Sequence, residues 1–310
     1  MTTREIIDWL LKGDVSMQYQ VRRDLLGKED IRLQKRIANE GWGKQFLSKQ
    51  TASGHWGRKF YQPKWTCTHY TLLDLRNLNI APDHEIIRKA ITLTLNTCRA
   101  ADGGIQLGPS TAGSGDVCVN GMFLNYASYF RMEENELRPL IDVLLNEIMA
   151  DGGFNCRTVA SGAHHSSVHS TLSVLEGLFE FQKAGYSYRR KEIRGARAGA
   201  EEFILKHRLF LSDRTGKIIS PAFLKLTYPC RWKYDILRAL DYFRYSGKTW
   251  DDRMSDAIAV VLRKRNSSST WNMQALHPGN VHFVMEKPGV PSRWNTLRAL
   301  RVLMHFKIEV

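Results

Sequence analysis

The chain has 310 residues, of which 43% are hydrophobic and 25% are charged. This composition is typical of a globular protein and excludes an intrinsically disordered chain, which lacks the apolar residues needed for a core. Lysine and arginine outnumber the acids by 45 to 31, which gives a formal net charge of +14. A field of this sign attracts anionic ligands or surfaces.

The sequence predicts a cytoplasmic protein with no transmembrane segment. No run approaches the roughly 20 apolar residues that a membrane-spanning helix needs. Residues 1–14 carry Arg4, Glu5, Asp8 and Lys12 within their apolar stretch, which is unlike a secretory signal. The five cysteines are widely spaced and form no Cys-x-x-Cys pair, so we expect reduced thiols rather than a disulfide framework.

Two dense basic clusters lie at residues 189–197 and 263–265. Neither is accompanied by a zinc-finger spacing or an RNA-recognition signature. We therefore interpret both as solvated helix faces or loops and expect no nucleic-acid partner.

In chain order, residues 6–11 and 18–26 are expected to form helices, and a repeated pattern begins after them. Each copy has a helix, a Gly- and aromatic-rich loop, and a second helix that starts with small polar residues and turns apolar. The first three loops lie at 53–57, 101–105 and 151–154, and their second helices start at 66–70, 116–120 and 166–170. Trp56, Ile105 and Phe154 occupy matching places at a constant spacing of 49.

Two further copies are looser. The fourth has its loop at 216–219 and its second helix from 231–235, and the fifth has its loop at 269–271 and its second helix from 291–295. In that last helix Leu297, Leu300 and Met304 share one face, and Asn295 is the expected N-cap.

A single hairpin of this kind cannot bury its apolar face alone, whereas several placed side by side share a core. The sequence therefore predicts an all-α fold, an α/α toroid of about five to six helical hairpins with second helices inside and first helices outside. We expect one domain over residues 1–310, with 1–40 capping or completing the ring and 41–310 carrying the repeats. An open α-solenoid is the alternative. The long polar loops before the second helices favour a closed ring.

The segments 53–57, 102–105 and 151–155 resemble the Gly-aromatic repeat motif of squalene cyclases and of protein prenyltransferase β-subunits. The resemblance spans about residues 40 to 305. Longer phrases at 63–66, 118–122, 169–178, 232–240 and 291–300 are similar to a bacterial group of squalene-cyclase-like proteins with no clear assigned reaction. The resemblance implies a toroid whose cavity takes an apolar, isoprenoid-like ligand.

The chain also departs from these families. It lacks the Asp-x-Asp-Asp run with which squalene-type cyclases protonate an alkene, so we do not expect that reaction. Residues 251–256 approach the Asp-Asp-x-x-Asp motif of class I terpene enzymes, with one extra residue. We interpret these acids as the start of a helix, where they complement the helix dipole.

The resemblance to prenyltransferase β-subunits further implies a zinc site. Those proteins hold zinc with Asp-x-Cys on one inner helix and His on the next, and Asp116, Cys118 and His169 match that pattern. Zinc favours tetrahedral sulfur, nitrogen and oxygen ligands, and three protein ligands leave one place for a substrate. His169 is thereby also a catalytic candidate, and Cys156, His164 and His165 are nearby substitute ligands. The alternative is a small buried cysteine and a hydrogen-bonded histidine.

Each loop before an inner helix is expected to place side chains at one end of the cavity. Aromatic rings there could line an apolar pocket, or they could simply pack the loop onto its helix. Asp235 is the acidic catalytic candidate, although it could equally be the N-terminal acid of its helix. His277, His282 and Glu286 lie on the last loop and could close that end. The candidate ligand-binding residues are Trp65, His69, Asn120, Trp232, Tyr234, His282 and Trp294.

Three functions follow from these features. The first is a terpene cyclase- or prenyltransferase-like protein that binds an apolar ligand with an anionic head, with zinc assisting a transfer reaction. The second is a hydrolase or lyase of acidic glycans, because α/α toroids also serve such enzymes. The third is a non-catalytic binding or scaffold protein.

Overall fold

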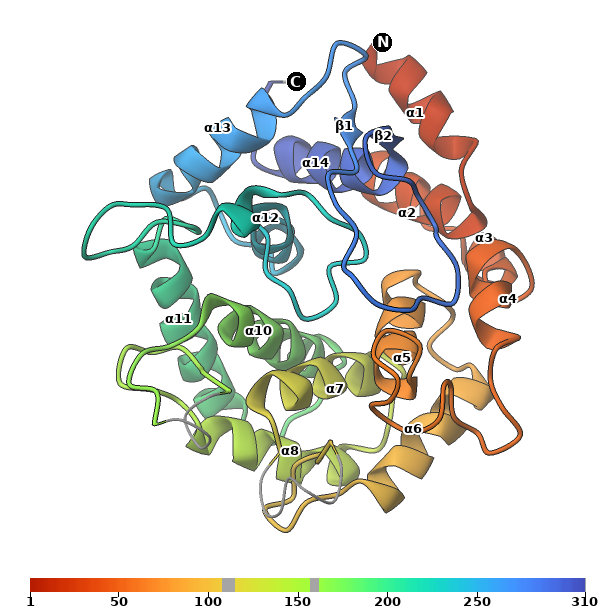
Figure 1. The fold of residues 1–310 in the computed structure, drawn as a ribbon, viewed down its shortest axis with the longest axis vertical. Helices are drawn as coiled ribbons and strands as arrows, with labels where there is room; N and C mark the ends of the chain where they lie inside the picture. Colours follow the sequence, from red (N-terminus) through yellow and green to blue (C-terminus); the bar gives the residue numbers. More distant parts are fainter. Residues whose placement is uncertain (108–114, 157–161, 310) are drawn as a thin grey trace. The chain divides into compact units, whose positions relative to one another are not determined.

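The computed structural model describes residues 1–107, 115–156 and 162–309. Helices dominate it, which confirms the predicted all-α class (Figure 1). In the described part of the chain, no helix is both long enough and apolar enough to cross a membrane. The chain forms two compact units: unit 1 comprises Met1–Ser48, Asn77–Ala81 and Leu205–Val310, and unit 2 comprises Lys49–Arg76 and Pro82–Ile204. The expectation of one domain therefore stays a prediction.

Unit 1 contains the N-terminal and C-terminal helices of the chain (Figure 1). Helix α14 contacts both α2 and α12. Short strands β1 and β2 pair in antiparallel register and close the loop of residues 273–290. The elements are α1 Thr3–Leu11, α2 Val15–Leu25, α3 Ile31–Arg36, α4 Gly41–Leu47, η1 Pro221–Leu224, α12 Ile236–Tyr245, η2 Asp252–Met254, α13 Ser255–Arg263, β1 Trp271–Asn272, β2 Pro291–Ser292 and α14 Arg293–His305.

Helix starts in unit 1 are set by short polar side chains that satisfy otherwise unpaired backbone N–H groups. Asp14 caps α2, and Asp235 caps α12 by accepting a hydrogen bond from the Arg238 N–H. Ser292 caps α14 by accepting from the Asn295 N–H at 2.9 Å. The sequence-based choice of Asn295 as this cap was wrong, because α14 begins at Arg293, three residues earlier than that choice requires.

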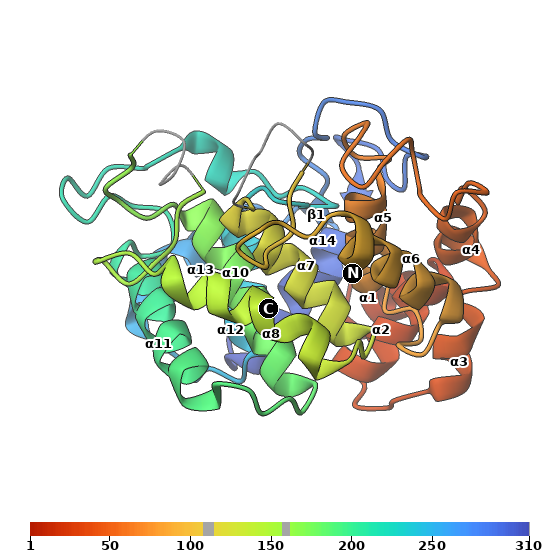
Figure 2. The same cartoon turned by 90° about the horizontal axis from the view of Figure 1, so that it is seen from below.

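The helices of unit 2 (Figures 1 and 2) differ in how much of their surface is buried. Helix α6 buries Ile87, Ile91 and Leu95, which lie on one face at helical spacing. Helix α7, by contrast, is buried at every residue from 119 to 128, as expected for a helix enclosed by neighbours. The elements are α5 Thr68–Asn77, α6 Glu85–Thr97, α7 Val117–Tyr129, α8 Glu134–Asn146, α10 Val168–Lys183 and α11 Arg190–Lys206.

Helices α7 and α10 approach each other closely because glycine occupies the contact on both. A Cβ atom at Gly177 would lie 2.3 Å from the backbone oxygen of Gly121, and one at Gly121 would lie 2.7 Å from the Ser173 oxygen. The Asn125 amide also donates to the Glu176 carbonyl at 2.9 Å. Side chains at the two glycines would force the helices apart.

One turn recurs four times before a buried hydrophobic residue. In each, a residue with positive φ donates its N–H to the carbonyl three positions earlier, and the buried residue follows two positions later. The N–H of that buried residue donates to a side-chain oxygen near the start of the next helix, at 2.7–3.0 Å. The turn residues are Gly54, Gly103, Gly152 and Ser269, the buried residues are Trp56, Ile105, Phe154 and Trp271, and the acceptors are Thr68, Asn120, Thr171 and Thr296.

Candidate functional site

A pocket in unit 1 is a candidate site. Its volume is about 200 Å³, and its wall comes from Phe46 of α4, from the segment 228–231 and from the loop that joins β1 to β2. The lining residues are Phe46, Tyr228, Pro229, Arg231, Ala275, Leu276, His277, Gly279, Val281, His282, Phe283, Val284, Met285 and Glu286. Most of this wall is apolar, with a few polar groups, as is common for small-molecule sites.

Glu286 fastens one side of the pocket to the start of α14. Its carboxylate accepts hydrogen bonds from the Arg293 N–H at 2.7 Å, from the Trp294 N–H at 3.4 Å and from the Ser292 hydroxyl. Burial raises the pKa of Glu286, and these donors oppose that effect. With its oxygens engaged in this way, Glu286 holds the loop in place.

Phe46 braces the same loop from α4. Its ring lies 4.6 Å from that of Phe283 and 5.7 Å from that of His282. His282, a predicted ligand-binding residue, is thus placed in the pocket wall.

Side chains of α14 also hold the segment that precedes the lining residue Tyr228. The Asn295 amide donates to the Leu226 carbonyl at 3.2 Å, and Arg298 donates to the Thr227 carbonyl at 3.1 Å. Arg298 also pairs with Asp235 at 3.4 Å. Because Thr227 directly precedes the lining residue Tyr228, these bonds fix the segment that carries Tyr228 and Arg231.

Asp235, the predicted acid, performs a structural task. It is 1% exposed, caps α12, pairs with Arg298 and accepts a hydrogen bond from the Cys230 thiol at 3.2 Å. It is not among the residues that line the pocket.

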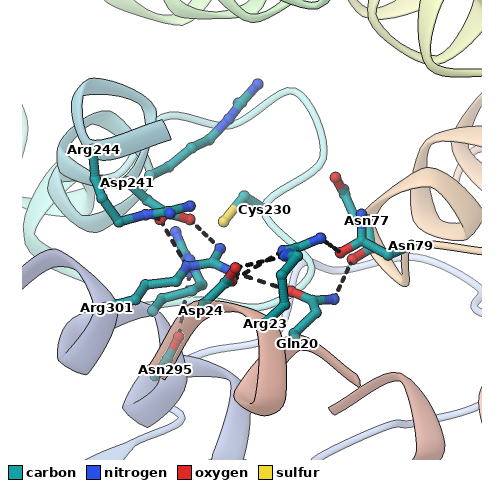
Figure 3. A network of polar contacts seen from close by, with 12 residues as sticks. Gln20, Arg23, Asp24, Asn77, Asn79, Cys230, Asp241, Arg244, Asn295 and Arg301 are labelled. Atoms are coloured by element: carbon teal, nitrogen blue, oxygen red, sulfur yellow. Dashed lines mark hydrogen bonds and ion pairs between the residues drawn. The ribbon is translucent and has the colours of Figure 1, made fainter. Parts of the chain in front are cut away.

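A second ion-pair network lies among α2, α12 and α14 (Figure 3). Arg301 donates to Asp241 and, at 2.8 Å, to Asp24, while Arg23 and Arg244 also pair with these two carboxylates. Burial alone would raise the pKa of Asp24, but the neighbouring guanidinium groups hold it at about 2. Both carboxylates therefore stay charged at neutral pH and tie the three helices together.

Arg231 brings a positive charge to the polar part of the pocket. Arg231 is 6% exposed. Burial, together with the charges of Lys233 and Arg231, lowers the pKa of His277 to about 4. His277 is therefore neutral at pH 7, and a bound anion would raise its pKa.

The remaining candidates of unit 1 pack loops onto helices. Trp294 is 1% exposed and stacks on Tyr228, with ring centroids 4.3 Å apart. Tyr234 donates its hydroxyl to the Leu209 carbonyl at 2.5 Å. Trp232 is partly buried, with the Lys233 ammonium 5.4 Å from its ring centroid.

In unit 2, the expected aromatic cavity wall is a packed cluster. His69 is fully buried, and its Nδ1 lies 3.2 Å from the Tyr126 hydroxyl. Its ring contacts those of Phe60, Tyr61 and Tyr70, and Trp65 packs on Tyr70. Burial lowers the pKa of His69 to about 3. Asn120 is also structural, because its side chain joins the Ile105 N–H to the Asp116 carbonyl.

The predicted zinc ligands are not assembled into a metal site. Among residues 1–107, 115–156 and 162–309, no group of three His, Cys, Asp or Glu side chains is arranged to hold one metal ion. Asp116 and Cys118 lie at the start of α7, and His169 is the second residue of α10. The contact that does form is between Cys118 and Cys156: the Cys118 N–H donates to the Cys156 sulfur at 3.1 Å.

Sequence reasoning did not single out Arg231, which lines the pocket. It belongs to the fourth repeat copy, but no motif distinguishes it from the chain's many other basic residues. Only the meeting of residues 228–231 with the loop before β2 reveals that it lines a pocket.

Comparison with known proteins identifies the architecture of the chain. No family model matches the sequence, and no curated protein does either. The structure is similar to that of a polysaccharide lyase, with a TM-score of 0.50 and 12% identity over 98% of this chain and 97% of the other. It also matches a type II terpene cyclase from Scytonema, with a TM-score of 0.46 and 15% identity over 94% and 87% of the two chains. At such identities the likeness concerns the fold alone, and the fold is an all-α toroid, as predicted.

Proposed function

We propose that the pocket of unit 1 binds a small ligand with an apolar body and one anionic head. The observation that carries this proposal is the burial of Arg231 in a wall that is otherwise largely apolar. A guanidinium group is always charged, and its planar set of donors suits a carboxylate or a phosphate.

The apolar part of the wall suits the body of such a ligand. Phe46 and Phe283 meet at 4.6 Å, and Val281 and Met285 line the pocket beside them. Leu276 and Val284 are 43% and 54% exposed at the edge of the pocket. Covering these side chains would remove apolar surface from water, which favours binding of a hydrocarbon chain.

The polar part of the wall suits the head. The positive charges of Lys233 and Arg231 both lower the pKa of His277. The carboxylate of Glu286 accepts hydrogen bonds from the start of α14. The net charge of +14 would also draw an anion from solution.

Titration calorimetry with geranyl phosphate and geraniol tests the proposal, because the two probes share an isoprenoid chain and differ in the anionic head. We expect geranyl phosphate to bind and geraniol to bind at least tenfold more weakly. Arg231→Gln should remove most of this preference, since it deletes the charge. Arg263→Gln, at an exposed position of α13, should behave as wild type. Equal binding of both probes, or an unchanged preference in Arg231→Gln, would overturn the proposal.

A second candidate function is elimination on a uronic-acid glycan. Arg231, His277 and Tyr228 line one pocket, and a polysaccharide lyase shares the fold. Arg231 would neutralise the substrate carboxylate and so acidify the adjacent C–H. Neutral His277 would accept that proton, and the Tyr228 hydroxyl would protonate the leaving oxygen.

Ultraviolet absorbance of the unsaturated sugar product tests this second candidate on a panel of uronic-acid polysaccharides. An absorbance rise that is lost in His277→Gln would favour elimination. Absence of product with every polymer in the panel would leave ligand binding as the proposed function.

A further inference from the structure

Two cysteines that are distant in sequence meet in unit 2. The Cys118 N–H donates to the Cys156 sulfur at 3.1 Å, across 38 positions of sequence. Both residues are partly exposed.

Local structure holds the Cys156 sulfur in this place. Cys118 is the second residue of α7, whose first-turn N–H groups have no partner within the helix. The Ser170 hydroxyl lies 3.1 Å from the same sulfur and accepts a hydrogen bond from the Cys156 N–H at 3.2 Å. Donors at a sulfur atom stabilise the negative charge that develops on it during thiol exchange.

We propose that Cys118 and Cys156 form a dithiol site that exchanges with small disulfides and closes into an intramolecular disulfide. The Cys156 sulfur attacks one sulfur of the external disulfide, whose S–S bond breaks and releases one thiol. The Cys118 sulfur then attacks the Cys156 sulfur and releases the second thiol. The protein loses two electrons and two protons, and the external disulfide gains both.

The other three cysteines are differently placed. Cys67 and Cys230 are buried, and the Cys230 thiol donates to Asp235. Cys98 is partly exposed like the pair, and its hydrogen-bond neighbour is the Thr97 hydroxyl at 3.6 Å. Cys98 is therefore a matched control for exposure without a neighbouring thiol.

The experiment treats the folded chain with glutathione disulfide, blocks free thiols under denaturing conditions and measures intact mass and cross-linked peptides. Wild type should lose two blockable thiols, retain no glutathione and yield a peptide linking Cys118 to Cys156. Cys118→Ser should retain one glutathione on Cys156, because no second thiol can release it. Cys98→Ser should behave as wild type.

A wild-type protein that retains glutathione, keeps all its thiols or links another pair would overturn the proposal. Phenylarsine oxide gives a second measurement, because trivalent arsenic needs two neighbouring thiols. Wild type and Cys98→Ser should bind one equivalent, and Cys118→Ser and Cys156→Ser none. Equal binding by all four proteins would contradict the site.

Discussion

Arg298 and Asp235 form an ion pair at 3.4 Å, with side chains only 4% and 2% exposed. Each has further partners: Arg298 donates to the Thr227 carbonyl, and Asp235 accepts from the Arg238 N–H and the Cys230 thiol. A buried ion pair is stable when hydrogen bonds satisfy its remaining polar groups. This pair joins α14 to the segment that carries the pocket residues Tyr228 and Arg231.

Breaking this pair should destabilise the protein strongly. Arg298→Gln leaves the Asp235 carboxylate buried without its counter-charge, which costs about 3–5 kcal/mol of unfolding free energy. Asp235→Asn combined with Arg298→Gln should recover part of the loss, because no charge then remains buried. Arg36→Gln, in the exposed pair with Glu40, should leave urea unfolding unchanged. Equal midpoints for Arg298→Gln and Arg36→Gln would show that the buried pair is dispensable.

Substitution at the contact of α7 and α10 should also destabilise. The alanine Cβ in Gly177→Ala would lie 2.3 Å from the Gly121 oxygen, and such overpacking costs about 1–3 kcal/mol. Gly195→Ala is the control, because Gly195 lies in α11 with no atom within 4 Å of the added Cβ. Gly195→Ala should raise the unfolding free energy by about 0.5–1 kcal/mol. Thermal unfolding measures both, and a stabilised Gly177→Ala variant would contradict the close contact.

Stability should fall as pH decreases from 7 to 3. Burial holds the pKa of His69 at about 3 and that of His277 at about 4 in the folded chain. The unfolded chain therefore binds more protons below about pH 6.5. Arg301 and its neighbours hold Asp24 at a pKa of about 2 in the folded chain. Asp24 therefore contributes about 2 kcal/mol to the unfolding free energy at pH values above its pKa in the unfolded chain, and this contribution is lost as the pH falls below about 4. Urea unfolding across this range measures the slope, and an unfolding free energy that rises on acidification would refute the assignment.

Local signals made much of the fold predictable. The turns before Trp56, Ile105 and Phe154 can be recognised from the sequence, because backbone positions with positive φ favour glycine. The two expected helices near residues 6–11 and 18–26 correspond to α1 and α2. These features depend on neighbours within one or two turns of chain.

The candidate site was less predictable because its contacts are remote in sequence. Asp235 was expected at a cavity, but Arg298, 63 positions away, buries it. The position of His69 was predicted and its environment was not, because Tyr126 belongs to another helix, 57 positions away. An aromatic ring at a helix start is compatible with either packing or ligand contact, and only the assembled neighbours decide between them.

In the proposed function an amphipathic anion enters the pocket beside Arg231, and the His277 imidazole reports on its binding directly. Its pKa, measured by NMR titration of the ring signals, should be near 4 in the free protein. Saturating geranyl phosphate should raise that pKa, because a nearby negative charge stabilises the imidazolium. Geraniol should leave it unchanged, and Arg231→Gln should raise it in the free protein by removing one cation. A His277 pKa that does not respond to saturating geranyl phosphate would contradict the claim.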